Sequence, residues 1–129
     1  MNKSIVLDAS ALLALLNQES GHRQIEEVLP NAVMSAVNVS EVISVLIRNQ
    51  ITDEEARNIT ADLVKEIIPF DESQAYIAAS LIKKTKRYGL SFGDRACLAL
   101  AKVNRIPVLA ADKIWSKLDV ADIKIKLIR

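Results

Sequence analysis

Short runs of β-branched and other apolar residues alternate with helical segments along the chain, and this alternation is the feature that most constrains its fold. Residues 4–7 and 32–35 are such runs, and each leads into a stretch whose apolar residues have helical spacing. Because strands joined by helical crossovers pair in parallel, the pattern predicts an α/β fold with a mostly parallel sheet and helices on both faces. The predicted strands occupy residues 4–7, 32–35, 66–70, 106–110 and 124–128.

Capping patterns set the predicted helix boundaries. Ser91 followed by Asp94 is typical of a capping box and opens an apolar helix that includes Cys97. Asn38 is predicted to cap a helix that ends near residue 49 and to place Glu41 at the third helical position. Further helices are predicted over residues 9–16, 22–29, 52–65 and 71–88, with a brief helical turn over 113–117.

The length indicates one domain over residues 1–129. Half of its residues are hydrophobic and few are aromatic, a composition that is typical of α/β proteins. The 17 basic and 16 acidic residues give a formal net charge of +1, so the chain lacks the bulk positive field of a general nucleic-acid coat protein. Its one cysteine, Cys97, cannot form an internal disulfide and is expected to be a packed thiol. No segment has the apolar length of a membrane span, so we expect a cytoplasmic protein without membrane insertion.

Acidic residues lie just beyond the carboxyl ends of the predicted strands. Asp8 follows the first strand and Asp112 the fourth, while Glu41 and Asp94 lie near the starts of helices. Because ligands of parallel sheets bind outside the carboxyl ends of the strands, these four acids are expected to share one rim. Asp71, after the third strand, is a fifth candidate.

Converging carboxylates repel one another, and a hard cation relieves that repulsion. An oxygen-only ligand set favours Mg²⁺ or Mn²⁺ over zinc, and the single histidine, His22, is expected at the surface. Such a cation retains water and accepts phosphate oxygens, so the acids predict phosphodiester hydrolysis by a metal-activated water. The alternative is that each acid only caps a helix.

Four segments, in order, resemble the motifs of the PIN domain, and the small size resembles the VapC-type toxin ribonucleases. The segments are IVLDASALLALL, NVSEV, SFGDRACLALA and VLAAD. The resemblance implies a PIN-like three-layer α/β/α fold with a five-stranded sheet in the order 3-2-1-4-5. It also implies an endoribonuclease dependent on Mg²⁺ or Mn²⁺, the toxin of a type II toxin–antitoxin pair. The implied partners are an RNA substrate, a cognate antitoxin protein and a second copy of the chain in a homodimer.

The resemblance assigns the catalytic and metal-binding roles to four acids. It implies that Asp8 and Asp94 hold the metal most directly, that Glu41 is a further ligand and that Asp112 is the fourth acid. The family commonly has Thr or Ser two residues before the fourth acid, where this chain has Ala110. This departure removes a hydrogen bond that would support Asp112.

Other polar residues near these acids have weaker assignments. Ser10 matches the small hydroxyl residue that supports the first acid, whereas Asp71 matches no metal position. Arg95 and Lys113 adjoin the metal-site acids, where they either meet substrate phosphates or face away as surface charges.

Three other classes of protein stay open. A receiver-type phosphoacceptor domain would have an acidic pair after the first strand, but Leu7 precedes Asp8. A haloacid-dehalogenase-like phosphatase would have a second Asp where this chain has Ser10. The third class is a non-catalytic PIN-like domain whose acids bind a protein partner or only cap helices.

Overall fold

The computed structural model describes residues 4–129, at whose centre lies a five-stranded sheet. The strands are β1 (Ile5–Leu7), β2 (Ala32–Ser35), β3 (Glu66–Ile68), β4 (Val108–Ala110) and β5 (Ile125–Leu127). Their order is β3-β2-β1-β4-β5, and all four pairings are parallel. The predicted order is confirmed, and β5 lies at an edge of the sheet as predicted.

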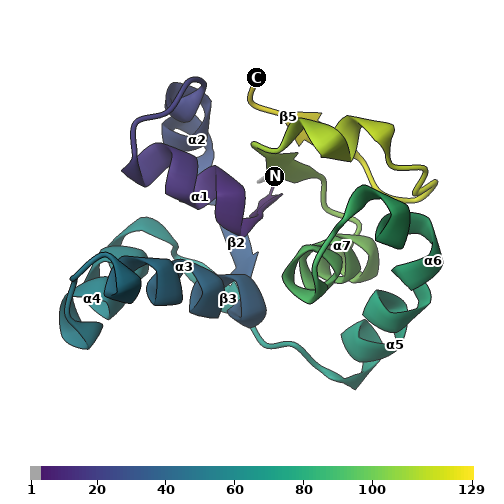
Figure 1. The fold of residues 1–129 in the computed structure, drawn as a ribbon, viewed down its shortest axis with the longest axis horizontal. Coiled ribbons are helices and arrows are strands. Elements are labelled where there is room, and N and C mark those ends of the chain that lie inside the picture. Colours follow the sequence, from purple (N-terminus) through teal and green to yellow (C-terminus); the bar gives the residue numbers. More distant parts are fainter. Residues whose placement is uncertain (1–3) are drawn as a thin grey trace.

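Helices cover both faces of the sheet. The α-helices are α1 (Ala9–Leu16), α2 (His22–Val28), α3 (Ala36–Arg48), α4 (Asp53–Leu63), α5 (Glu72–Ser80), α6 (Ile82–Thr85) and α7 (Phe92–Asn104), and the short 3-10 helices are η1 (Leu29–Asn31), η2 (Lys86–Tyr88) and η3 (Lys113–Lys117). Figure 1 shows α1 to α4 on one side of the sheet and α5 to α7 on the other, which confirms the predicted three-layer architecture. None of the helices in residues 4–129 combines the length and apolar character needed to cross a bilayer.

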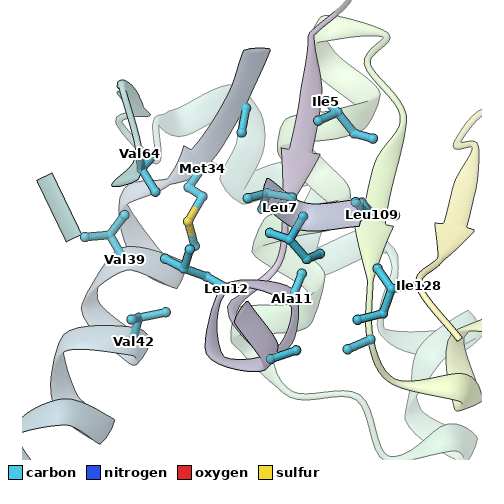
Figure 2. Packing of buried hydrophobic residues seen from close by; sticks show 14 of the residues in the cluster. Ile5, Leu7, Ala11, Leu12, Met34, Val39, Val42, Val64, Leu109 and Ile128 are labelled. Atoms are coloured by element: carbon cyan, nitrogen blue, oxygen red, sulfur yellow. The ribbon is translucent and has the colours of Figure 1, made fainter. Parts of the chain in front are cut away.

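Neighbouring residues of each central strand enter different hydrophobic cores. Leu7 and Leu109 belong to one cluster, which also includes Leu12 of α1, Met34 of β2 and Val42 of α3 (Figure 2). Val6 and Val108 belong to a second cluster, which includes Leu98 of α7 and Trp115 of η3. Because side chains alternate between the faces of a strand, a sheet buried on both faces needs uninterrupted apolar runs. This requirement explains why the central strands lack polar residues until their carboxyl ends.

The start of α3 differs from the prediction, because Asn38 does not cap this helix. Ser35, the last residue of β2, is the cap, and its hydroxyl accepts the N–H of Val37 at 3.1 Å. The helix therefore begins directly after the strand, and Glu41 lies in its second turn rather than at its third position. The predicted cap Ser91 is confirmed, and Thr52 and Asp71, the first residues of two other predicted helices, are the caps of α4 and α5.

The single helix predicted over residues 71–88 is divided into α5, α6 and η2, with the first break at Leu81. The hydroxyls of Ser80 and Thr85 donate to the carbonyls of Ile77 and Leu81. Hydroxyls that bond to nearby main-chain carbonyls compete with helical hydrogen bonds and bend helices. The predicted stop at Gly89 is confirmed, since this residue has a φ of 73° directly after η2.

Two prolines explain why β3 and β4 are shorter than predicted. β3 ends at Ile68, directly before Pro69, and β4 begins directly after Pro107. Proline has no N–H to donate to a neighbouring strand, so it sits at strand ends and sheet edges. The carbonyl of Pro107 still accepts the N–H of Val6 at 2.8 Å. The sheet is thus confined to short strands, and the polar loops begin close to its centre.

Because the sheet has a hydrophobic core on each face, we expect the cost of shortening an apolar side chain to depend on how deeply that side chain is buried. Ile25 is fully buried in α2, whereas Ile47 on α3 is 38% exposed. We expect Ile25→Ala to lower the free energy of unfolding by about 2–5 kcal/mol and the matched variant Ile47→Ala by less than about 1 kcal/mol. Urea denaturation of both variants measures the difference, and equal losses would contradict the assignment of the core.

Candidate active site

Asp8 lies at the carboxyl end of β1 and is almost completely buried, with 2% of its surface exposed. It caps α1, because its Oδ1 accepts the N–H of Ala11 at 2.9 Å. The hydroxyl of Ser10 lies 2.8 and 2.7 Å from the two carboxylate oxygens and accepts the N–H of Ala111 at 3.2 Å. Ser10 therefore joins the carboxylate to the end of β4 and fixes its orientation.

The surroundings of Asp8 oppose its ionisation. The pKa of its carboxyl is raised from 3.8 to about 7, because burial and the charges of Asp94 and Glu41, which raise it, outweigh the hydrogen bonds from Ser10 and Ala11, which lower it. Burial is the largest of these effects, since a charge removed from water loses its hydration. Without a cation, the Asp8 carboxyl is therefore partly protonated at neutral pH.

Glu41 projects from α3 toward the start of α7. Asn38, one turn earlier and 1% exposed, donates from its amide nitrogen to Glu41 Oε1 at 2.8 Å and to the carbonyl of Gly93 at 2.9 Å. Both partners are acceptors, so the amide nitrogen must face them. Asn38 thus ties the two helices together and holds the carboxylate of Glu41 between them.

The carboxylate of Glu41 occupies space that only a glycine leaves free. A Cβ added to Gly93 would lie 2.1 Å from Oε2 of Glu41 and 2.4 Å from its carboxyl carbon. Such distances are far inside van der Waals contact, so the absence of a side chain at this position permits the Glu41 carboxylate to lie against the backbone of α7. Gly93 is accordingly a requirement for this position of the Glu41 carboxylate.

Asp94 is the third residue of α7 and forms a capping box with Ser91. Its Oδ2 accepts the N–H of Ser91 at 2.9 Å, and its own N–H donates to the hydroxyl of Ser91 at 3.3 Å. Within residues 4–129, Oδ1 of Asp94 and Oε2 of Glu41 have no hydrogen-bond partner. Each carboxylate is therefore oriented through one oxygen and keeps the other for a ligand.

Cys97, one turn further along α7, lies beneath these acids. It is fully buried, which raises the pKa of its thiol well above the ordinary value, and the charges of Asp8, Asp94 and Glu41 raise it further. The carboxylates of Asp94 and Glu41 thus act on two buried groups from separate elements, Asp8 and Cys97. The structure brings Asp8, Glu41 and Asp94 together, and Cys97 is a packed thiol as predicted.

Asp112 lies apart from this trio. It is exposed, and its Oδ1 accepts the N–H of Ile114 at 3.0 Å, which caps η3. Its charge is not among those that raise the pKa of Asp8. Asp112 and Lys113 line a hollow that also includes Ser10, so they border the site rather than enter it.

The other two candidates have local roles. Asp71 caps α5 by accepting the N–H of Gln74 at 2.9 Å. Arg95 is half-buried and donates from Nη1 to the carbonyl of Leu90 at 3.4 Å, while its buried Nε has no partner in the part of the chain that the structure describes. Arg95 forms no ion pair within residues 4–129, which leaves its charge available to an anion.

The chemistry of the donor set fits Mg²⁺ or Mn²⁺, because Asp8, Glu41 and Asp94 offer only carboxylate oxygens. The oxygen Oδ1 of Asn38 adds a buried acceptor that has no hydrogen-bond partner among the described residues. In the present conformation, no three acidic, His or Cys side chains of residues 4–129 are grouped closely enough to hold a metal. Binding of one cation by all three carboxylates therefore requires them to move closer together.

Asn38 and Gly93 are the site residues that the sequence did not reveal. Asn38 was assigned to helix capping, although an amide three residues before an acid in a helix shares its face. Gly93 lies within the first turn of α7, where glycine is an unfavourable helix former. A glycine at such a position is the sequence signal for a group that lies close against the helix backbone.

The buried carboxyl of Asp8 predicts a pH-dependent stability of the metal-free protein. Its pKa of about 7 in the folded state exceeds the 3.8 of an unperturbed Asp, so the folded state loses stability as pH rises from about 4 to 7. We expect Asp8→Asn to remove this dependence and to stabilise the metal-free protein above pH 7 by up to roughly 4 kcal/mol. Urea unfolding of both proteins in EDTA at pH 5 and 8 measures this pH dependence. If Asp8→Asn were less stable than wild type at pH 8, the loss of the helix cap would outweigh the relief of the buried charge.

The chain is similar to known proteins in sequence and in fold. Ribonuclease VapC42 from Mycobacterium tuberculosis is 28% identical over 127 residues, which cover 90% of this chain and 96% of the relative. A solved DNA-bound VapBC from Salmonella typhimurium has a TM-score of 0.74 at 13% identity, covering 99% of this chain and 100% of that one. VapBC-5 from Mycobacterium tuberculosis has a TM-score of 0.65 at 25% identity, covering 99% of both chains. The model of the PIN domain matches residues 5–121, and the chain therefore belongs to the PIN domain family.

Proposed function

We propose that this protein is an endoribonuclease dependent on Mg²⁺ or Mn²⁺ and the toxin of a type II toxin–antitoxin pair. The observation that carries the proposal is the convergence of the Asp8, Glu41 and Asp94 carboxylates at the carboxyl end of a parallel sheet. The relatives named as VapC ribonucleases and the solved VapBC complexes support the choice of RNA as substrate and of an antitoxin as partner. A homodimer completes the proposed assembly.

The proposed mechanism assigns a task to each acid. Asp8, Asp94 and Glu41 would hold the cation, which supplies an activated water and neutralises charge on the phosphate. Ser10 and Ala11 keep the carboxylate of Asp8 in one orientation, and this carboxyl would have to be ionised to hold a cation. Asn38 holds Glu41 at the start of α7, which shortens the movement needed to complete the site.

The exposed side of the site suits a polyanionic substrate. Asp112 and Lys113 border the hollow beside Ser10, and Lys113 offers a cation to a phosphate entering there. Arg95, on the first turns of α7, offers a second cation. We assign these residues to substrate contact and Asp112 to the edge of the metal site.

A second candidate function is a non-catalytic PIN-like domain that binds a protein partner. The observation that favours it is that Asp8 and Asp112 cap helices and that Asp94 completes the capping box of Ser91. Capping accounts for these three acids, although it leaves Glu41 and its contact with Asn38 unexplained.

Cleavage of RNA separates the two functions. We expect the purified protein to cleave a mixed-sequence single-stranded fluorogenic RNA with Mn²⁺ or Mg²⁺ but not in EDTA, because the acids need the cation to activate water. Asp94→Asn from the same preparation should lose at least about 100-fold in rate, and it guards against contaminating nuclease. Mn²⁺ should also raise the melting temperature of wild type more than that of Asp94→Asn. Equal cleavage by both proteins, with no metal-dependent shift, would favour the binding domain.

The fit of Glu41 against Gly93 generates a second prediction. The Cβ of Gly93→Ala would displace the flexible end of Glu41, so this variant should lose metal-dependent cleavage by a factor similar to that of Glu41→Ala. The double variant should lose no more than either single one, because both changes remove the same carboxylate from the site. Melting temperatures check that each variant is folded, and fully additive losses would contradict the proposed contact.

A further inference from the structure

A basic hollow lies at the end of the sheet opposite the acidic site. It has a volume of about 760 Å³ and is situated where α7 ends and where β4 and β5 begin. Its lining contains four cations, one carboxylate and two apolar residues, namely Lys102, Arg105, Lys124, Lys126, Asp122, Ile106 and Pro107. We call this set of residues the basic hollow.

The cations of the basic hollow come from two distant segments. Lys102 and Arg105 lie at the end of α7, where cations complement the helix dipole. The helix dipole does not explain the other two cations. Lys124 directly precedes the edge strand β5, and Lys126 lies within it. Lysines protect exposed sheet edges, but this role does not require them to face the cations of α7 across one hollow.

The positive charge of the basic hollow is not neutralised within the protein. The ion pairs of residues 4–129 are Arg129 with Glu19 and His22 with Glu26, so none of the four cations has a carboxylate partner. All four side chains are exposed. Asp122 is the one acid in the lining, and a polyanion is therefore the ligand that complements the surface.

We propose that the basic hollow binds the phosphate backbone of RNA at a position separate from the acidic site. The lining contains no aromatic side chain on which a base could stack, so it contacts phosphates rather than reading bases. This inference rests on the proposed function only in taking RNA as the polyanion. It adds a second RNA contact, independent of sequence, to the site where the bond is cut.

Helix α7 sets the separation of the two contacts. Asp94 lies in its first turn and Arg105 directly follows its last residue. At 1.5 Å per residue, the axial distance between these two positions is about 16 Å. A substrate that reaches both contacts must therefore be long or folded, whereas a tetranucleotide that lies across the acidic site leaves the basic hollow free.

RNA binding in the Asp94→Asn background tests the proposal without cleavage. The probe is a folded RNA of about the size of a transfer RNA, and its affinity is measured by fluorescence anisotropy over a range of salt concentrations. We expect Lys124→Glu/Lys126→Glu to weaken binding at least about 10-fold. The slope of log K against log salt concentration should fall by the amount expected for the loss of about one to two phosphate contacts. Lys124→Arg/Lys126→Arg should retain the affinity.

A matched control separates this site from a general effect of net charge. Lys83→Glu/Lys84→Glu on α6 makes the same change of charge at exposed positions outside the basic hollow and should leave the affinity within about twofold. Equal losses in the two charge-reversed variants, or no loss in either, would overturn the proposal. A tetranucleotide should lose less affinity than the folded RNA on Lys124→Glu/Lys126→Glu, and equal losses for both probes would also overturn it.

Failure of this proposal and failure of the proposed function give different results. A protein that does not cleave RNA but binds it through Lys124 and Lys126 would refute the nuclease and retain the basic hollow. Metal-dependent cleavage by a protein whose RNA affinity does not depend on these lysines would support the nuclease and refute RNA binding by the basic hollow. If an acidic peptide bound to the hollow and RNA did not compete with it, the occupant would be a protein and the proposal would be wrong.

Discussion

The burial of one carboxylate, that of Asp8, is the constraint on which the acidic site depends. A buried charge is costly unless hydrogen bonds or an opposite charge compensate for it. Ser10 and Ala11 provide part of that compensation, but the neighbouring carboxylates of Asp94 and Glu41 act in the opposite direction. Stability alone would not retain such a group at the end of β1. A ligand that carries positive charge gives the arrangement a physical reason.

The layers were predictable because they follow from patterns within short segments, whereas the strand order was predicted only from the resemblance to the PIN domain. Alternating apolar runs and helical stretches identify a parallel sheet, and residues such as Ser91 and Thr52 mark helix starts by themselves. The errors occur where a neighbour along the chain competes. Ser35 replaces Asn38 as a cap because β2 continues directly into α3, and the helix that propensity favours over residues 71–88 is broken at Leu81.

The sequence predicted which acids of the candidate site converge, but it did not predict the contacts that hold them. Asp8, Glu41 and Asp94 converge as their positions after strands and in early helix turns suggest. The contact of Asn38 with Gly93 spans 55 positions of the sequence, and no local pattern specifies it. Asp112 has the right position in the sequence, but the short turn that it caps keeps its carboxylate exposed. Sequence reasoning thus finds which acids share a rim, whereas packing decides how near they come.

Helix α7 illustrates why charge along a single element is weak evidence of function. Asp94 near its start and Lys102 near its end are what the helix dipole favours in any helix. The informative charges are those that other elements add at each end. Glu41 from α3 and Asp8 after β1 join Asp94, while Lys124 and Lys126 of the β5 segment join Lys102. Capping and the protection of a sheet edge explain Asp8 and the two lysines one at a time, but they do not explain why charges of one sign gather at each end of α7. A net charge of +1 conceals both groups, because regions of opposite sign at the two ends of the sheet cancel in the sum.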